Sequence, residues 1–434
     1  MVHDDGPVGL GGVEVVFDDE RVVSDAGVML VATLAQRLGI EALAADLVRL
    51  RRDRPGAANA GRKVMALIYA MVLGADSIDD TAVLRCGRTG RLLGGWVAAP
   101  STLGTFLRAF TFGHVRQLDA LLDRSLERAW KAGAGPGADR LVIDVDSFVG
   151  EVCGRLKQGA AYGYTKLLGY HPILATRADT REALHIRLRK GSANSQKGML
   201  RFTEELIARV NRAGASGVKL LRADSGFWNN KVFERLEKAG WQYSIGVRMQ
   251  KGIREVVEAI DEDAWQPIDY PEQGEAQIAE TRSGGRRLIV RRTRLLGAQA
   301  ELWPDWRHFA FITNREEEIA IVEAEHREHA VVEQVIADLK DQALAHFPSG
   351  QFNANGAWVV LAALAHNLLR WTQSLGLPDT TVRAARTLRR RLLGIPGRLT
   401  RHARGWTLHL PARWPWHNDY TSALTRIRAL PAPT

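Results

Sequence analysis

Two acidic residues close a short apolar run near the middle of the chain, and this feature constrains the fold more than any other. Leu141, Val142 and Ile143 lead into Asp144 and Asp146. A run of this composition predicts a buried β-strand. Because side chains alternate across a strand, both carboxylates should lie on one face, where a polar cavity or a metal ion is needed to hold them. Taken alone, the pair fits a solvated strand end or a helix N-cap equally well.

A second strand-like run ends in another acid. Residues 218–223 are followed directly by Asp224. A sheet that places this strand beside the first would bring Asp146 and Asp224 to one edge. Carboxylate oxygens are the ligands that Mg²⁺ prefers in proteins, so this edge is a candidate metal site.

A predicted helix adds a third carboxylate, Glu333. His326 and His329 precede Glu333 by seven and four positions, and Lys340 follows it by seven. This spacing puts the four side chains on one helical face. Such a face is a poor core surface and a good wall for an active site, although a solvated helix would show the same pattern.

The charge balance of the chain favours a polyanionic partner. Its 434 residues hold 59 Lys and Arg against 49 Asp and Glu, a formal charge of +10, and most of the basic residues are Arg. Arginine binds phosphate through two parallel hydrogen bonds, which suits nucleic acid. Ordinary enzymes from GC-rich genomes are also Arg-rich, so charge alone does not establish DNA binding.

Cysteine content and hydropathy exclude several classes of protein. The two cysteines, Cys86 and Cys153, cannot form a disulfide framework or a four-cysteine zinc site, and they fit a reducing cytoplasm. No apolar run approaches the roughly 18 residues of a membrane span, and the N-terminus lacks a signal-peptide pattern. We therefore expect a cytoplasmic protein with no membrane partner.

Composition and periodicity predict an α/β fold divided into five segments. The segments are a flexible arm (1–25), a helical region (26–131), a Gly-rich linker (132–138), a mixed α/β region (139–371) and a basic C-terminal region (372–434). In the arm, only residues 13–17 have the composition of a strand. Within the α/β region, residues 248–315 alternate in short runs and predict a β-rich insertion, and a long helix is expected over 316–346.

Three groups of residues are candidates for contact with DNA. A helix beginning at Pro100 fits a helix-turn-helix reader or, equally, a plain helix of a bundle. Arginines after residue 380 are candidates for phosphate contact, and three tryptophans for stacking on an unpaired base, although Trp is more often a core residue. The candidates are Thr102, Thr105 and Arg108 on the helix, Arg389, Arg390, Arg391, Arg398 and Arg401 in the basic region, and Trp228, Trp303 and Trp306.

Several motifs in order along the chain resemble the DDE transposases of bacterial insertion sequences, and among them the IS1380 type, which is related to the IS4 group. The motifs include DVDS at 144–147, GYHPILA at 169–175, RLRKGSAN at 187–194, LRADSGF at 221–227 and ANGAW at 354–358, with further matches at 157–166, 99–104 and 396–399. The likeness covers nearly the whole chain. Together the motifs are far more specific than any single pair of acids.

The resemblance implies an RNase H-like catalytic domain over 139–371, with the β-rich insertion between the second acid and the glutamate. An all-α DNA-binding domain would precede it, and a helical basic region would follow. The resemblance assigns Asp146, Asp224 and Glu333 as catalytic residues and as ligands of two Mg²⁺ ions, with Mn²⁺ as a substitute. Asp144 becomes an alternative ligand or a support for the ligands.

The resemblance also implies the roles of neighbouring residues. Relatives carry a Tyr, Arg, Glu, Lys face on the helix of the glutamate. Here Glu333 and Lys340 match that face, while His326 and His329 stand at the Tyr and Arg positions. These two histidines and Lys340 are expected to contact DNA phosphates. Phe148 stands where many relatives have Thr.

The expected function is that of a DNA transposase, which cleaves transposon ends and joins the freed 3′-OH to target DNA. The expected partners are double-stranded DNA, as terminal inverted repeats and as target, and a second copy of the chain on paired ends. The expected location is the bacterial cytoplasm, at the nucleoid. Two alternatives stay open: a catalytically silent DNA-binding protein derived from a transposase, and an RNase H-like nuclease without strand transfer.

Overall fold

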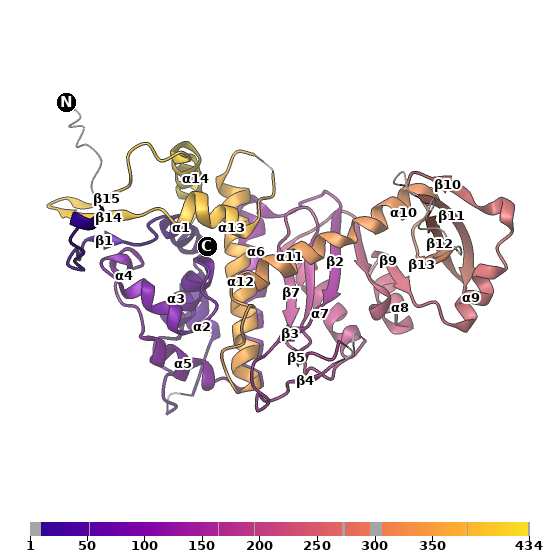
Figure 1. The fold of residues 1–434 in the computed structure, drawn as a ribbon, viewed down its shortest axis with the longest axis horizontal. Coiled ribbons are helices and arrows are strands. Elements are labelled where there is room, and N and C mark those ends of the chain that lie inside the picture. The colour runs from indigo at the N-terminus through magenta and orange to yellow at the C-terminus, as the bar shows by residue number, and fades with distance from the viewer. Residues whose placement is uncertain are drawn as a thin grey trace.

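A computed structural model describes residues 10–51, 53–163, 165–194, 196–270, 274–295, 306–379 and 381–432. The molecule is elongated (Figure 1). Helices of the N-terminal third and the C-terminal segment lie together at one end, a sheet with its helices occupies the middle, and residues 251–313 form the other end.

A nine-stranded mixed sheet is the main scaffold, and it confirms the predicted α/β class. Its strand order is β10-β11-β12-β13-β9-β8-β2-β6-β7. Strand β2 pairs in parallel with β8 and antiparallel with β6, β8 pairs in parallel with β9, and β6 pairs antiparallel with β7. The bounds are β2 Leu141–Ser147, β6 Ile173–Arg177, β7 Ala183–Arg187, β8 Lys219–Ala223 and β9 Gln242–Val247. The apolar run that opens the sequence argument is thus an inner strand of the sheet.

The segment predicted to be β-rich adds four antiparallel strands to this sheet. They are β10 (Gln266–Ile268), β11 (Gly274–Ser283), β12 (Arg286–Leu295) and β13 (Arg307–Thr313). Strand β13 pairs with β9, with Ala310 opposite Val247, so the insertion continues the sheet. Helix α9 (Lys251–Glu258) packs on β11.

Helices connect the inner strands of the sheet and follow its last strand in the sequence. Helix α7 (Met199–Ala213) connects β7 to β8, and α8 (Asn230–Lys238) connects β8 to β9. After β13 come α10 (Ile319–Arg327) and α11 (Val331–Lys340), which run along the sheet in Figure 1. A small second sheet, in the order β3-β5-β4, lies beyond β2 and consists of Gly150–Glu151, Leu168–Tyr170 and Ala161–Tyr162.

The long helix expected over 316–346 is broken at a 3₁₀ turn, Glu328–Ala330. Beside this turn, Arg222 Nη1 donates to the carbonyl of Glu325 at 2.5 Å. The helix tightens to a 3₁₀ turn there, and α10 and α11 are separate elements on either side of it.

Helix α12 (Phe352–Gly376) joins the sheet to the N-terminal helices. Nearly all of its 25 residues are buried, as expected for a helix that is apolar all round. It packs on β7 on one side and on the N-terminal helices on the other (Figure 1). Those helices are α1 Val28–Arg37, α2 Ile40–Leu47, α3 Ala60–Val72, α4 Thr89–Leu92, α5 Pro100–Arg108 and α6 Phe112–Ala129.

A buried carboxylate holds three of these parts together. Glu182 accepts hydrogen bonds from the indole N–H of Trp130 at 3.0 Å and of Trp371 at 2.5 Å, and Arg177 donates to it at 3.3 Å. Trp130 opens the π-helical turn that follows α6, Trp130–Ala134, and Trp371 belongs to α12. The first three residues of the predicted Gly-rich linker belong to this turn, and the chain leaves the helical conformation at Gly133, whose φ is 108°.

The two ends of the chain fold against each other, which differs from the expectation for the arm. Residues 13–17 form no strand and are exposed, whereas β1 (Val22–Val23) pairs with β14 (Gly397–His402). Strand β15 (Gly405–His409) completes this sheet of three strands. The C-terminal helix α14 (His417–Ala429) packs on α1 and α12.

Among the described residues, no single helix is long and apolar enough to cross a membrane. The pair α1 and α2 passes the length and composition test only together, with a 62° bend between them.

Candidate active site

Asp146 and Asp224 meet at one edge of the large sheet because their strands are parallel neighbours in register. Val145 lies opposite Ala223, so the next residue of β2 and the residue after β8 are the two acids. Asp146 Oδ1 accepts the amide of Ser147 at 2.6 Å. Asp224 caps a 3₁₀ turn, with Oδ1 accepting the amide of Gly226 at 2.9 Å. Backbone amides one or two residues further on thus fix both carboxylates at the ends of the two strands.

Glu333 approaches the same place from α11, which packs on β2 and β6. It lies in the first turn of the helix and is exposed. Burial raises the pKa of Asp146 to about 6. The Ser147 amide and His329 oppose this rise, and the charges of Asp224 and Glu333 add to it. The three carboxylates predicted from sequence therefore act on one another electrostatically.

The donor set fits a divalent cation. None of the three carboxylates has an ion pair with a Lys or Arg among the described residues, so no Lys or Arg there offsets their mutual repulsion. Their oxygens are not all within 4.8 Å of one another.

Asp144 has a different environment from Asp146, although both lie on one face of β2. Its side chain is fully buried, and Arg222 binds both of its oxygens, with Nε to Oδ1 at 2.7 Å and Nη2 to Oδ2 at 2.9 Å. His329 Nδ1 adds a contact with Oδ1 at 3.3 Å. The alternative in which Asp144 is a metal ligand is not supported, because both oxygens are already occupied.

The two histidines of the predicted helical face both point toward the sheet, whereas Glu333 is exposed. His326 Nδ1 bonds to Ser244 Oγ at 2.8 Å, and its ring stacks on Phe311 at 4.0 Å between centroids. Burial lowers the pKa of His326 to about 3, so the ring is neutral. This placement contradicts the predicted phosphate contact of His326. His329, 17% exposed, points at Asp144 and lies close enough to Asp146 to affect its pKa.

Lys340 and Phe148 border the carboxylates on the other side. Lys340 is exposed, and its ammonium lies 5.5 Å from the centre of the buried Phe148 ring. The side chain stands two turns of α11 beyond Glu333 on the same exposed face. The predicted placement of Lys340 beside the site therefore agrees with the geometry.

His171 is a site neighbour that the sequence argument did not single out. Its Nε2 bonds to Ser147 Oγ at 3.0 Å and its Nδ1 to the carbonyl of Ala193 at 2.5 Å. Burial lowers the pKa of His171, the Ala193 carbonyl and Asp224 raise it, and Arg189 lowers it. The signal was present, because His171 and Ala193 belong to two of the motifs that carry the family resemblance.

The predicted DNA-reading helix exists as α5 and begins at Pro100 as expected. Its polar side holds a chain of hydrogen bonds: Arg108 Nη2 donates to Thr105 Oγ1 at 3.3 Å, and Thr105 donates to the carbonyl of Ser101 at 3.0 Å. Thr102 is half-buried and Arg108 is exposed. Contact of these side chains with DNA stays a prediction.

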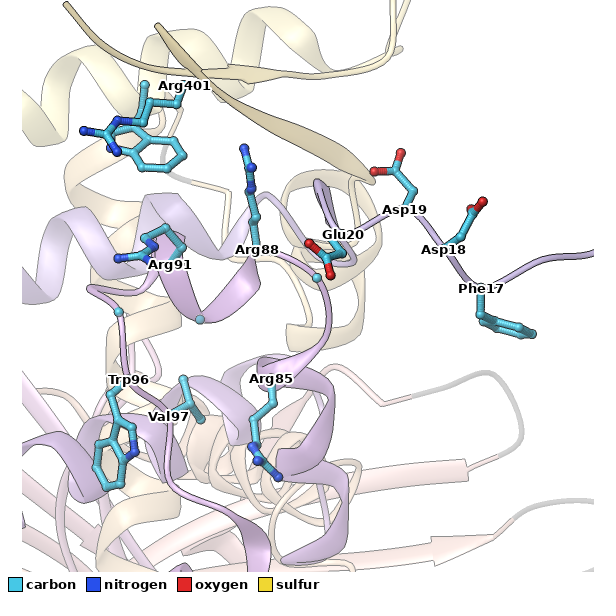
Figure 2. Close-up of a pocket in the computed structure, with 14 residues that line it drawn as sticks. Phe17, Asp18, Asp19, Glu20, Arg85, Arg88, Arg91, Trp96, Val97 and Arg401 are labelled. Carbon is cyan, nitrogen blue, oxygen red and sulfur yellow. The ribbon is translucent and has the colours of Figure 1, made fainter. Parts of the chain in front are cut away.

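Of the arginines predicted to contact phosphate in the basic region, two are held by protein contacts and three are exposed. Arg389 is bound to Asp341 and Gln342, both at 2.9 Å, so its predicted phosphate contact is contradicted by an internal ion pair. Arg391 lies over the ring of Trp416 at 5.4 Å. Arg390, Arg398 and Arg401 are exposed, and Arg401 borders the pocket drawn in Figure 2.

The tryptophan candidates are held by protein contacts. Trp228 is half-buried and packs against the main core. Trp306 lies 4.5 Å from the guanidinium of Arg292 and 4.7 Å from that of Arg294. Trp303 lies outside the described residues. Base stacking by Trp228 or Trp306 would need these contacts to open.

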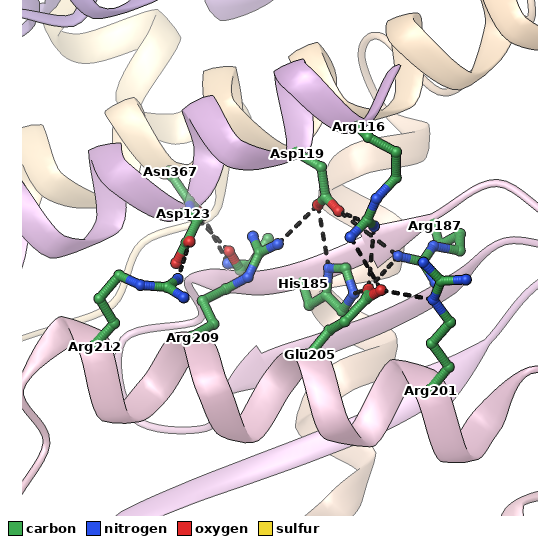
Figure 3. A network of polar contacts seen from close by, with 11 residues as sticks. Arg116, Asp119, Asp123, His185, Arg187, Arg201, Glu205, Arg209, Arg212 and Asn367 are labelled. Carbon is green, nitrogen blue, oxygen red and sulfur yellow. Dashed lines mark hydrogen bonds and ion pairs between the residues drawn. The ribbon is translucent and has the colours of Figure 1, made fainter. Parts of the chain in front are cut away.

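A second cluster of potential ligands is an ion-pair network (Figure 3). Asp119 of α6, His185 of β7 and Glu205 of α7 have ligand atoms within 4.8 Å of one another. Four arginines surround the two carboxylates: Arg116, Arg187, Arg201 and Arg209. Their positive charge repels a cation, so this cluster joins α6 to the sheet and is not a metal site.

The network should stabilise the protein only above mildly acidic pH. Burial by itself raises the pKa of Asp119 and of Glu205, but His185 and the arginines lower both pKa values well below the usual range. A carboxylate with a lowered folded pKa contributes stability above its unfolded pKa of about 4, and this contribution is lost as the pH falls below that value.

We expect Asp119→Asn to lower the free energy of unfolding at pH 7 by about 1.5–3 kcal/mol. The difference from wild type should shrink between pH 4 and pH 2, measured by urea unfolding at each pH. Asp46→Asn, at an exposed surface pair with Arg49, is the matched control. A gap between Asp119→Asn and wild type that is the same at pH 7 and pH 3 would contradict the sign argument.

Acidic side chains gathered past the ends of neighbouring strands are typical of enzymes that act with divalent metal ions. A family model described as Transposase DDE domain group 1 matches residues 7–432. The chain belongs to this family, which confirms the resemblance to DDE transposases and supports a transposase function.

Comparisons with curated proteins and with solved structures add less information than the family match. No curated protein matches the chain. A solved structure of the piggyBac transposase synaptic complex with hairpin DNA is similar in fold, with a TM-score of 0.48 and 13% sequence identity, over 86% of this chain and 80% of that chain.

Proposed function

We propose that the protein is a DNA transposase of the IS1380 type that cleaves transposon ends and joins the 3′-OH to target DNA. The observation that carries the proposal is the meeting of Asp146, Asp224 and Glu333 past β2 and β8. The strand order β7-β6-β2-β8-β9, with β6 alone antiparallel to both of its neighbours, supports an RNase H-like catalytic domain over 139–371.

The chain's own residues prepare the site for phosphodiester chemistry. Asp146, Asp224 and Glu333 would hold two Mg²⁺ ions, or Mn²⁺ in their place. When bound, these ions supply Lewis-acid activation of water or a 3′-OH and stabilise the charge on the leaving oxygen. Lys340 offers an ammonium to a phosphate beside the reacting bond.

Two sets of contacts keep the ligands in place. The Asp144–Arg222 pair, with His329, ties β2 to β8 and to the start of α11. The Ser147–His171 hydrogen bond fixes the turn directly after Asp146. Because small displacements of reacting groups are costly, this support should affect rate more than substrate affinity.

The proposal extends to partners and domains. The helical region 26–131 with α5, and the exposed arginines of 372–434, would bind double-stranded DNA at terminal inverted repeats, and two copies would act on paired ends. Residues 132–138 would mark the boundary to the catalytic domain.

The test uses the purified full-length protein and a labelled duplex that carries the inverted repeats flanking its reading frame. With Mg²⁺ or Mn²⁺ the protein should nick at the repeat end and produce joined molecules in the presence of target DNA. Nicking without joined products would favour a nuclease. End binding without nicking would favour a silent DNA-binding protein.

Binding to the end duplex should weaken steeply with salt. Each phosphate contact releases counterions, so the logarithm of the binding constant should fall with the logarithm of salt concentration with a slope of about −0.9 per contact. Fluorescence anisotropy between about 50 and 200 mM salt measures this slope. Arg390→Ala should make the slope about one unit shallower, and Arg389→Ala should leave the slope unchanged because that side chain is ion-paired internally.

A further inference from the structure

A pocket of about 850 Å³ lies where the N-terminal arm, the segment 85–97 and the C-terminal hairpin β14–β15 meet (Figure 2). Its size is within the range of about 300–1,000 Å³ that accommodates a small ligand. The pocket is separate from the carboxylates: none of Asp146, Asp224 and Glu333 lines it. Its charged and aromatic lining residues are Arg85, Arg88, Arg91, Trp96, Arg401 and Trp406, with Phe17, Asp18, Asp19 and Glu20 from the arm.

Positive charge in the pocket is available to a ligand. Arg85, Arg91 and Arg401 are exposed, and none of them forms an ion pair within the part of the chain that the structure describes. Arg88 is held in place, because its Nη1 donates to the carbonyl of Leu399 at 2.7 Å. Three guanidinium groups without an ion pair around one hollow are suited to phosphate groups of a polyanion.

Two exposed indoles accompany these arginines. Trp96 is 51% exposed and Trp406 is 47% exposed, which is unusual for residues of this size. Arg88 and Arg401 lie 5.5 Å and 5.8 Å from the centre of the Trp406 ring, so cation–π contacts hold that indole at the pocket. Arginines interleaved with exposed aromatic rings are typical of sites for single-stranded nucleic acid, where bases stack on the rings.

The acidic arm lies at the same pocket but is not bound to its arginines. Asp19 contacts Arg21 and Arg398, both outside the pocket lining. Asp18 and Glu20 have no ion pair among the described residues. The arm is anchored just beyond them, where the amide of Arg88 donates to the carbonyl of Val22 at 2.8 Å. Two unpaired acids therefore stand beside unpaired arginines, where they lower the local positive charge.

We propose that this pocket binds a DNA strand with unpaired bases, taking its phosphates on Arg85, Arg91 and Arg401 and a base on Trp406 or Trp96, in competition with Asp18 and Glu20. A base inside a duplex has no free face for an indole, so unpaired DNA is the favoured occupant. The inference rests on the proposed function and adds a second DNA site, remote from the catalytic carboxylates.

The first test measures the affinity of the full-length protein for a labelled single-stranded oligonucleotide by anisotropy, without metal. Trp406→Ala should weaken binding about 5- to 100-fold, and Trp406→Phe should restore most of it, because an aromatic face is what a base requires. Arg85→Ala with Arg91→Ala should make the salt slope shallower by about 0.7 for each lost contact. Arg49→Ala, an exposed arginine outside the pocket, is the control.

In the second test, removal of negative charge from the arm should raise the affinity for single-stranded DNA. Asp18→Asn with Glu20→Gln should strengthen single-strand binding, whereas Glu14→Gln, in the same arm but outside the pocket, should not. The pocket proposal would be overturned if the Trp406 and arginine variants bound single-stranded DNA as tightly as the Arg49→Ala control. Weaker binding after Asp18 and Glu20 are neutralised would also overturn it. A wild-type protein that binds neither single-stranded DNA nor the end duplex would instead overturn the proposed function.

Discussion

Asp224→Ala should abolish nicking of the end duplex and leave binding of that duplex nearly unchanged. The carboxylate stands past β8, opposite Asp146, and has no protein cation to neutralise it among the described residues. Loss of a residue that merely supports a metal ligand costs about 10- to 100-fold in metal affinity or activity, so loss of a ligand should exceed about 100-fold. The readout is the initial rate of nicking in Mg²⁺, with binding measured by anisotropy on the same preparation.

Asp224 also caps the turn Ser225–Phe227, so a structural loss must be separated from a chemical one. Removal of a cap costs about 0.5–2 kcal/mol of stability. Asp224→Asn keeps an oxygen for the Gly226 amide and removes the charge. We expect this variant to be as inactive as Asp224→Ala but as stable as the wild type. If Asp224→Asn nicks at the wild-type rate, the assignment of the three carboxylates is wrong.

Arg222→Ala should be the most destabilising single change in the central sheet. It leaves the carboxylate of Asp144 fully buried without its cation and frees the carbonyl of Glu325. Removing one partner of a buried ion pair costs about 3–5 kcal/mol. The free energy of unfolding from urea titration measures this cost. Nicking should also fall, because the Asp144–Arg222 pair joins β2 to β8 beside the catalytic carboxylates.

A double-mutant cycle measures the coupling energy between Asp144 and Arg222. Asp144→Ala with Arg222→Ala should be clearly more stable than the sum of the two single losses predicts, since no uncompensated charge remains. Arg254→Ala, at an exposed arginine, should change stability by less than about 0.5 kcal/mol. Strictly additive losses would mean that the two side chains are not coupled in solution.

Local periodicity was enough to predict several elements of the fold. The strand through Asp146, the strand before Asp224, the start of α5 at Pro100 and the apolar helix α12 all lie where the sequence pattern places them. These predictions hold because alternation in strands and the repeat of a helix are properties of neighbouring residues.

Non-local contacts account for the errors. His326 and Glu333 are seven residues apart, which in one helix would put them on one face. The 3₁₀ turn between α10 and α11 changes that spacing, and His326 packs against Phe311 of a strand that the local pattern does not place beside it. The pairing of β1 with β14 joins the two ends of the chain, and Asp341 binds Arg389. No local propensity reports such partners.

Asp144 and Asp146 also show which properties follow from the local sequence and which depend on the tertiary structure. The sequence by itself determined that Asp144 and Asp146 share one face of a buried strand, because side chains on a strand alternate with period two. The family resemblance favoured Asp146, and only the tertiary structure supplied the physical difference between the two. Arg222 comes from the neighbouring strand and binds both oxygens of Asp144, whereas Asp146 stands at the strand end beside Asp224 and Glu333. A buried charge must be paired, and the identity of the partner depends on which strands are adjacent in space.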